Sequence, residues 1–256
     1  MRTTSPALLS SHLLALLLAL LLPSCSGAPT ETEAPAKTQA KESSLPVETK
    51  SVKPGINKRF KDPNMDVGRA MKTFEGESRE IFIEKVKIAK SLELADGQDV
   101  ADIGSGTGLF LPYFTKGVGA QGKVYAVEIS PKFIEHIQTL SKKKNWNQVQ
   151  TVFCTDKSTK LPADSIDAAF ICDTYHHFEY PMTTMASLHL AMRPGGRLVI
   201  VDFERIPGTS RKWILGHVRC DKETVIKEVT AAGFVYVDQI KMKGLKENYL
   251  IRFKRP

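Results

Sequence analysis

The stretch DVADIGSGTG, residues 99–108, joins a short apolar run to three glycines at alternate positions. The pattern predicts a buried strand over 99–103 and then a tight turn into a helix, because glycine readily adopts the backbone conformations that sharp turns need. A turn of this kind can cradle a phosphate, form part of a nucleoside pocket, or simply reverse the chain.

The residues around the turn separate these roles. A dinucleotide fingerprint has the pattern G-x-G-x-x-G, and Leu109 stands where its last glycine would be. Asp102 would repel a pyrophosphate, but it can accept a hydrogen bond from the α-amino group of a ligand. Glu128, at the end of the next predicted strand, can bind both hydroxyls of an unphosphorylated ribose. The two acids therefore predict a site for a nucleoside that carries an amino acid.

The chain alternates apolar strand patterns with amphipathic helix patterns. Helices are predicted from Leu109, from Pro131 after an N-cap at Ser130, from Pro181, and after Asp221. The order predicts an α/β, Rossmann-like, doubly wound sheet of seven strands, mostly parallel with an antiparallel last strand. Its ligands should bind at the carboxyl ends of the central strands. The predicted strands are 99–103, 123–129, 148–153, 166–171, 197–203, 234–241 and 248–253.

Four segments resemble the motifs of one enzyme family, in the family's order. VADIGSGTG (100–108) resembles the first motif of class I S-adenosylmethionine (SAM)-dependent methyltransferases, and AVEIS (126–130) is similar to their ribose-binding strand end. CTDKSTKLPADSIDAAF (154–170) is similar to the segment that reaches the adenine, and AMRPGGRLVIVDF (191–203) resembles the turn before the fifth strand. The resemblance extends over roughly residues 60–256, and it is greatest to the small-molecule branch that includes the ubiquinone and menaquinone methyltransferases.

The resemblance implies that SAM is the cofactor and indicates which residues bind it. Asp156 would lie near the adenine amine, although it is one residue out of register with the family's spacing. The cofactor-binding residues that it implies are Asp102, Gly104, Ser105, Gly106, Thr107, Gly108, Glu128, Ile129, Asp156 and Cys172.

The fourth predicted strand is followed by CDTYHHFEYP, residues 172–181, which its position brings to the ligand end of the sheet. Methyl transfer is an in-line displacement that needs alignment and, for most acceptors, removal of a proton. His176 or His177 is the predicted base, with Asp173 and Tyr175 as further catalytic candidates. A single histidine more often packs than reacts, so a role for His177 in holding the loop stays open. No metal site is predicted.

Two other segments are candidates for the walls of the site. Residues 60–82 are expected to form helices over the cofactor. The segment 205–223 follows the fifth strand, where this family builds its acceptor pocket; it can bind an acidic or aromatic acceptor, or it can simply pack. The residues concerned are Phe74 and Arg79 in the first segment and Arg205, Trp213, His217 and Arg219 in the second.

The first 55 residues have a composition unlike that of a globular domain. The apolar run 13–22 is shorter than the ~20 residues that span a bilayer, and with its basic start it predicts a signal peptide over 1–24. The sequence LPSC at 22–25 resembles a bacterial lipobox, in which Cys25 is lipidated. Residues 25–55 are rich in Pro, Thr, Glu, Lys and Ser and predict a flexible tether. The methyltransferase domain is expected over 56–256, on an exported lipoprotein anchored in the bacterial cell envelope.

Charge and cysteine content limit the partners. The formal net charge is +8, but the basic clusters at 142–144 and 252–255 have no nucleic-acid-binding motif around them, so no nucleic-acid partner is expected. Beyond Cys25, the three cysteines at 154, 172 and 220 have no C-x-x-C spacing, and they predict neither a disulfide framework nor a zinc site.

The sequence thus favours a membrane-tethered enzyme that moves a methyl group from SAM to a small acceptor, a lipophilic one included. A catalytically inactive SAM- or nucleoside-binding lipoprotein, with a sensing or scaffold role, is the alternative. A nucleotide-dependent oxidoreductase is disfavoured by Leu109.

The lipobox makes a direct prediction about the mature N-terminus. Mass spectrometry of protein from its native host should find a chain that begins at an acylated Cys25. Cys25→Ala should abolish acylation and release the protein from membranes, because Cys25 would carry all the acyl chains on which stable anchoring depends. An unmodified Cys25 would contradict the prediction.

Overall fold

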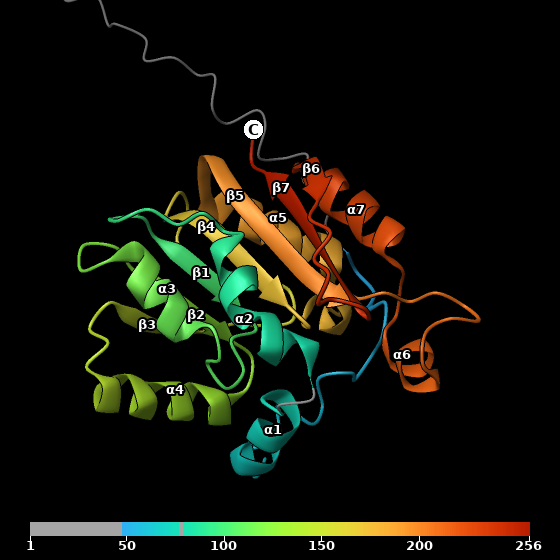
Figure 1. Cartoon of the computed structure of the whole chain (residues 1–256), viewed down its shortest axis with the longest axis horizontal. Helices are drawn as coiled ribbons and strands as arrows, with labels where there is room; N and C mark the ends of the chain where they lie inside the picture. Colours follow the sequence, from blue (N-terminus) through green and yellow to red (C-terminus); the bar gives the residue numbers. More distant parts are fainter. Residues whose placement is uncertain (1–47, 77–78) are drawn as a thin grey trace, which may run out of the picture. The chain divides into compact units, whose positions relative to one another are not determined.

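The computed structural model describes residues 48–76 and 79–256 (Figure 1). The predicted signal peptide, Cys25 and the tether up to residue 47 lie outside the described residues. Within the described part of the chain, no helix has both the length and the apolar character that a membrane span requires.

A seven-stranded sheet forms the centre of the domain. Its order is β3-β2-β1-β4-β5-β7-β6, and only β7 runs antiparallel to its neighbours, which confirms the predicted fold class. The strands are β1 (Val100–Ile103), β2 (Val124–Glu128), β3 (Val149–Phe153), β4 (Ile166–Cys172), β5 (Met192–Phe203), β6 (Val235–Gln239) and β7 (Asn248–Lys254).

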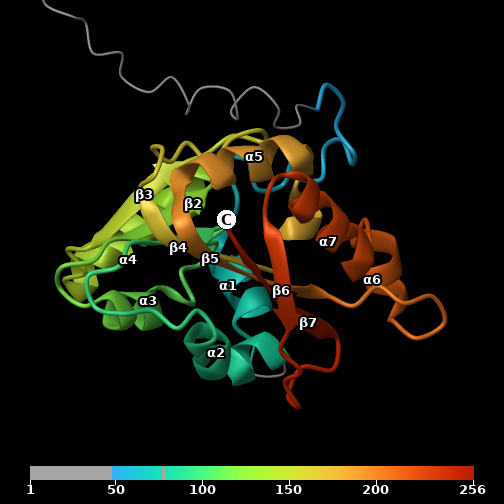
Figure 2. The ribbon, with the colours of Figure 1, turned by 90° about the horizontal axis from the view of Figure 1, so that it is seen from above.

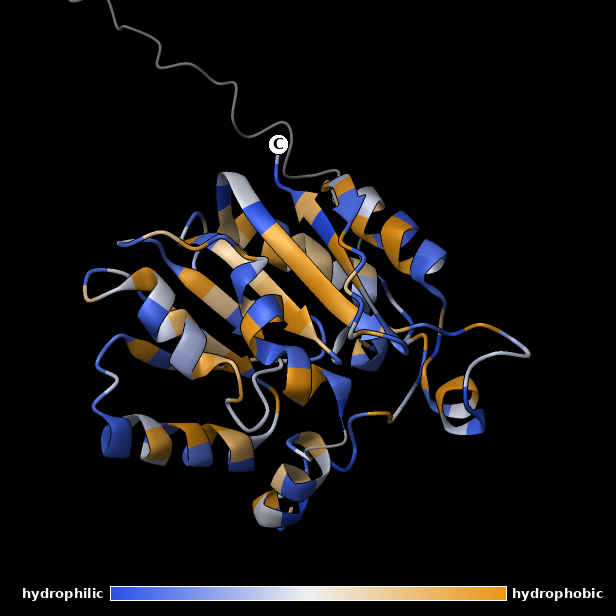
Figure 3. Ribbon diagram, viewed as in Figure 1, coloured by the Kyte–Doolittle hydropathy of each residue, from blue (hydrophilic) through white to orange (hydrophobic). Residues whose placement is uncertain are grey.

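Helices cover both faces of this sheet, as Figures 1 and 2 show. One apolar cluster joins the sheet to α2 (Glu80–Lys90), α3 (Leu111–Val118) and α4 (Pro131–Lys144). The other joins it to α5 (Pro181–Ala191) and α7 (Lys222–Ala231). Because both faces are buried, the central strands β1 and β2 are buried along their whole length and, apart from Asp102 and Glu128, are largely apolar rather than alternating (Figure 3).

Local sequence signals explain where the helices begin. The Ser130 side chain accepts a hydrogen bond from the backbone N–H of Phe133 and caps α4, and Asp221 caps α7 through Thr224 in the same way. The turn predicted at 193–196 is instead an irregular start of β5, where the pairing with β4 shifts register.

The strand order reverses between β1 and β4, which are neighbours in the sheet although β2 and β3 lie between them in sequence. At such a switch point the two loops that leave the carboxyl ends diverge and open a crevice for a ligand. The crevice here lies between the glycine turn after β1 and the loop after β4, which contains the short 3₁₀ helix η2 (Tyr175–His177).

The segment before the first helix lies against this end of the sheet. Glu179 accepts hydrogen bonds from Ser51 Oγ (2.9 Å) and Gly55 N (3.2 Å), and its carbonyl accepts one from Val52 N. Residues 48–55, which the sequence assigns to the tether, therefore contact the domain. The chain then continues through α1 (Val67–Phe74) into α2.

Candidate functional site

A single cavity of about 1200 Å³ opens at the switch point. It is lined by the loops after β1, β2 and β4, by residues 56–60, by α1 and α2, and by α6 (Lys212–His217). Small-molecule sites usually measure roughly 300–1,000 Å³, so this cavity has room for two ligands side by side.

The glycine turn forms the floor of the cavity at one end. Gly104 has φ of +75°, and a Cβ on it would lie 2.3 Å from Thr174 Cγ2 in the loop after β4. No other residue can take this position, because the backbone conformation and the close approach both exclude a side chain. The turn is therefore pressed against the β4 loop, and its backbone N–H groups at Gly104 and Gly106 donate to the Val127 carbonyl and to Glu128 Oε2.

Glu128 is held rigidly at the end of β2. Its Oε1 accepts hydrogen bonds from the backbone N–H groups of Ile129 (2.7 Å) and Ser130 (2.9 Å), and its Oε2 accepts one from Gly106 (2.8 Å). The residue is 5% exposed, and burial raises its pKa while the three backbone donors oppose the rise. The carboxyl group is thus fixed in the wall, with lone pairs left for a ligand.

Asp102 lies beside Glu128 and is 3% exposed. Its Oδ2 is buried, and no described residue donates a hydrogen bond to it. Burial, with a smaller contribution from the charge of Glu128, raises the pKa of Asp102 to about 7. A buried acceptor without a partner is costly, so the arrangement suits a ligand that brings a cationic donor.

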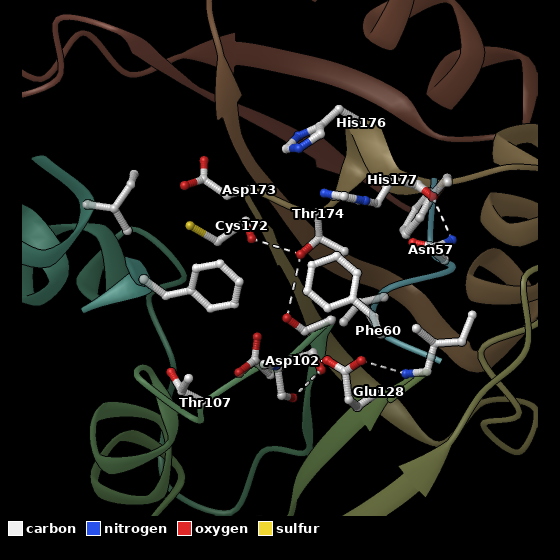
Figure 4. Close-up of a pocket in the computed structure, with 18 of the residues that line it drawn as sticks. Asn57, Phe60, Asp102, Thr107, Glu128, Cys172, Asp173, Thr174, His176 and His177 are labelled. Carbon is white, nitrogen blue, oxygen red and sulfur yellow. Dashed lines mark hydrogen bonds between the residues drawn. The ribbon is translucent and has the colours of Figure 1, made fainter. Parts of the chain in front are cut away.

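The loop after β4 separates this acid end from the other end of the cavity (Figure 4). Asp173 has φ of +47° and forms an ion pair with Arg79 of the segment before α2. Its Oδ1 accepts a hydrogen bond from Asn248 Nδ2 at 2.6 Å. Burial raises the pKa of Asp173 to about 6, against the opposing effect of the Arg79 guanidinium. Asp173 therefore ties the loop to α2 and β7.

His176 forms the best-oriented pair at the far end. Its Nδ1 lies 2.7 Å from Asp202 Oδ1, and its backbone N–H donates to Asp202 Oδ2 at 3.0 Å. Both side chains are almost fully buried. Because a carboxylate only accepts hydrogen bonds, the Nδ1 of His176 carries the proton of this bond, and Nε2 is the ring nitrogen left for another partner.

His177 and His217 complete this end. Their Nε2 atoms are 3.3 Å apart, and the His217 ring stacks on Trp213 with 5.0 Å between centroids. Burial, together with His176, His217 and Lys53, lowers the pKa of His177 to about 2. The imidazole of His177 is therefore neutral at physiological pH. We call His176, His177 and His217 the histidine cluster.

The structure brings most of the predicted site residues together. Of the predicted set, those that line the cavity are Asp102, Gly104, Ser105, Gly106, Thr107, Glu128, Ile129, Cys172, Asp173, His176 and His177. Of the segment 205–223, Trp213 and His217 line it too, whereas Arg205 and Arg219 are engaged by the Leu215 and Val218 carbonyls and by Glu228 respectively.

Three predicted residues do not line the cavity. Tyr175 is fully buried in the core, where its hydroxyl donates to Glu228 Oε2 at 2.9 Å, so it is not available to a substrate. Gly108 serves packing, since a Cβ there would meet Leu111 at 2.9 Å. Asp156 forms an ion pair with Lys61 and accepts a hydrogen bond from Asn57, and Cys154 and Thr155 line the cavity instead of it.

Several contributors were missed by the sequence reasoning. Asn57 donates to the His177 carbonyl at 3.0 Å, and the Phe60 ring meets the His177 ring edge-on at 5.2 Å. Asp202, at the end of β5, orients His176. The one available signal was Asp202 itself, because an acid at the carboxyl end of a central parallel strand lies at the ligand edge of the sheet.

Comparison with known proteins finds similarity to methyltransferases. Residues 101–200 match the profile of a methyltransferase domain family. A ubiquinone/menaquinone biosynthesis C-methyltransferase of a Marinomonas species is 26% identical over 114 residues, which is 43% of this chain and 44% of that protein. A tRNA U34 carboxymethyltransferase of Dichelobacter nodosus is 32% identical over 41% of this chain and 32% of its own length. The chain thus spans less than half the length of these curated relatives.

Solved structures show the same fold. A SAM-dependent methyltransferase from Aquifex aeolicus aligns with a TM-score of 0.66 at 22% identity, over 75% of this chain and 99% of that one. The cyclase SpnF aligns with a TM-score of 0.59 at 13% identity, over 68% of this chain and 80% of its own, so the fold by itself does not fix the reaction. The profile match over residues 101–200 and this fold together support a methyltransferase domain of the class I SAM-dependent type, with SAM as its cofactor.

Proposed function

We propose that this protein transfers a methyl group from SAM to a small, largely apolar acceptor that binds against the histidine cluster. The observation that carries the proposal is the continuity of one cavity from the acids Asp102 and Glu128 to the histidine cluster. A methyl donor at one end and an acceptor at the other can react there in line, and holding them in this geometry supplies much of the acceleration.

The cofactor end suits SAM group by group. Glu128 would accept hydrogen bonds from the ribose hydroxyls, and Asp102 would pair with the α-ammonium group through its buried, unpartnered oxygen. The sulfonium would then lie near Cys172 and Asp173, at the end of β4. Burial raises the pKa of the Cys172 thiol well above its ordinary value, so this residue acts as an uncharged wall and not as a nucleophile.

The acceptor end is aromatic. Phe60, Phe74 and Phe133 pack around one another with ring centroids 6.2–6.3 Å apart, and Phe203 meets Trp213 edge-on on another wall. Flat apolar molecules suit such walls. The similarity to quinone C-methyltransferases points the same way. Lipidation at Cys25, if it places the domain at a membrane surface, would bring a lipophilic acceptor within reach.

The comparisons give no support to the alternative of an inactive SAM-binding lipoprotein, and the oriented His176–Asp202 pair beside the cavity favours an enzyme over a binding module. The direct test is to incubate the protein with methyl-labelled SAM and an extract of membranes and metabolites, and to search for labelled products. We expect a labelled small molecule that is lost with Glu128→Ala. Tight SAM binding without any labelled product would overturn the proposal.

Glu128 provides the first quantitative prediction. Glu128→Ala should weaken SAM binding by about 1.5–3 kcal/mol, since charge-assisted hydrogen bonds to the ribose are lost. Calorimetry measures the change, and Glu135→Ala on the exposed face of α4 is the control that should bind normally. Equal affinity in the two variants would remove Glu128 from the cofactor site.

The buried carboxyl of Asp102 predicts a pH dependence. Its pKa of about 7 in the free protein means that it is protonated, and unable to pair with the SAM ammonium, at lower pH. SAM should therefore bind roughly tenfold more weakly at pH 6 than at pH 7.5. In Asp102→Asn the affinity should be low at both values and nearly independent of pH. A wild-type affinity that does not change between these values would contradict the pairing.

His176 should matter for turnover and not for cofactor binding. His176→Ala should lower the single-turnover rate ~10²–10⁴-fold, the range for a group that activates an acceptor by proton transfer. SAM affinity should stay within twofold, because this residue lies at the acceptor end. His136→Ala on α4, outside the cavity, is the matched control. A normal rate in His176→Ala would exclude the residue from acceptor activation.

A further inference from the structure

The histidine cluster contains more imidazoles than proton removal requires. His176 and His177 come from η2, and His217 comes from the end of α6, 40 residues later. One ring nitrogen from each lies within 4.8 Å of the other two. Across residues 48–76 and 79–256, no other group of His, Cys, Asp and Glu side chains has the geometry of a metal site.

The spacing of the nitrogens fits a metal ion. A tetrahedral Zn²⁺ with Zn–N bonds of 2.0–2.1 Å sets its ligand nitrogens about 3.3–3.4 Å apart. His177 Nε2 and His217 Nε2 are already 3.3 Å apart. The widest pair in the cluster has to close by no more than about 1.5 Å, a shift that ring rotation provides. A direct hydrogen bond between the two imidazoles also explains their distance, but it does not involve His176, whose ring lies beside both.

The surroundings of the His176 ring match those of known metal ligands. A ligating histidine almost always donates its other ring N–H to a carboxylate or carbonyl, which fixes the tautomer. Asp202 accepts in this way from His176 Nδ1 at 2.7 Å and leaves Nε2 free to bind. Trp213 stacks on His217, with 18° between the ring planes, and holds that ring in place.

One cationic side chain, Lys53, lies near the histidine cluster. The Lys53 ammonium group donates hydrogen bonds to the carbonyl oxygens of Gly216 and His217, so it lies close to the cluster. The Lys53 ammonium group is hydrogen-bonded to carbonyl oxygens, whereas the Asp202 carboxylate accepts a hydrogen bond from the His176 ring itself. The Asp202 carboxylate, hydrogen-bonded to one of the three rings, would compensate part of the charge of an ion.

We propose that His176, His177 and His217 form a zinc site whose fourth, open position takes the hydroxyl or thiol of the methyl acceptor. This inference rests on the proposed function for the identity of the reaction, but the ion-binding part can be tested without an acceptor. Three protein ligands with one open position is the pattern of catalytic zinc, whereas structural zinc has four protein ligands.

The ion would activate the acceptor. Bound to it, an O–H or S–H group would become more acidic and lose its proton to solvent, so that His176 would activate the acceptor as a ligand of the ion and not by taking the proton itself. The electron pair of the resulting anion forms the new bond to the methyl carbon of SAM. The carbon–sulfur bond of the sulfonium breaks, and its electron pair stays on sulfur as a neutral thioether. No oxidant or reductant is needed.

Zinc and cobalt titrations test the site on the full chain after treatment with a chelator. We expect one Zn²⁺ per chain by calorimetry, and with Co²⁺ the strong visible absorption of a tetrahedral complex. His217→Ala should lose that absorption, and Asp202→Asn should weaken Zn²⁺ binding ~10–100-fold while keeping the three ligands. His136→Ala is the control that should bind both ions normally.

Measuring SAM binding in the same preparations distinguishes a failure of the zinc site from a failure of the proposed function. Normal SAM binding without uptake of Zn²⁺, or with equal uptake by wild type and His217→Ala, overturns the zinc site and leaves the methyltransferase proposal standing. Absence of SAM binding in the wild-type protein overturns the proposed function instead. The His217 variant is the informative one because its side chain is half-buried on a short surface helix and tolerates truncation better than the buried His176.

The open position has its own test. Adding 2-mercaptoethanol to the Co²⁺-loaded protein should produce a sulfur-to-cobalt charge-transfer band, because thiolate is a strong ligand for such ions. SAM bound beforehand should not block it, since the cofactor occupies the other end of the cavity. A cobalt spectrum that the thiol leaves unchanged would contradict an open fourth position.

Discussion

The site depends on the contact between the loops that leave β1 and β4. Gly104 meets Thr174 so closely that a methyl group would not fit between them, and the Thr174 hydroxyl donates to the Cys172 carbonyl at 2.8 Å. Since β1 and β4 are adjacent strands, this contact fixes the distance between the acid end and the histidine end of the cavity. A methyl group has to travel a short, defined path between two bound molecules, and a rigid junction between the two loops provides it. The strand order therefore does more than create a crevice, because it determines how far the donor lies from the acceptor.

The two ends of the cavity are built in different ways. The acid end is local: the glycine turn and the backbone donors around Glu128 come from the loops directly after β1 and β2. The histidine end is assembled from distant parts of the chain, with Asn57 holding the His177 carbonyl, Asp202 holding the His176 ring and α6 supplying His217. A site of this kind forms only once the segment before α1 and the loop after β5 are both in place. This division suits an enzyme family that keeps one cofactor and varies its acceptor.

The same division explains what could be predicted. Apolar periodicity and helix caps predicted the fold class, and the glycine turn with the family resemblance predicted most of the acid end, because these signals act within a few residues of one another. The exception, Asp156, is held by Lys61 of a segment almost a hundred residues away. In the loop after β4, sequence alone could not tell which of three successive residues faces the cavity; the 3₁₀ turn sends Tyr175 into the core and the next two residues toward the ligand. His217 joins them only through the fold.

The charges of the reaction favour the walls that this cavity has. SAM carries a positive sulfonium and an activated acceptor carries negative charge, so the two charges cancel as the methyl group moves. A transition state with less charge than its reactants is destabilised less than they are by apolar surroundings. The aromatic residues Phe60, Phe74 and Phe133 supply such surroundings, and their ring faces also attract a cation. Asp102 is suited to pair with the SAM ammonium at one end, Asp202 orients the histidine cluster at the other, and the Asp173 carboxylate between them is paired with Arg79. A cavity with aromatic walls, and with Asp102 and Asp202 at its opposite ends, thus both holds the reactants and favours their reaction.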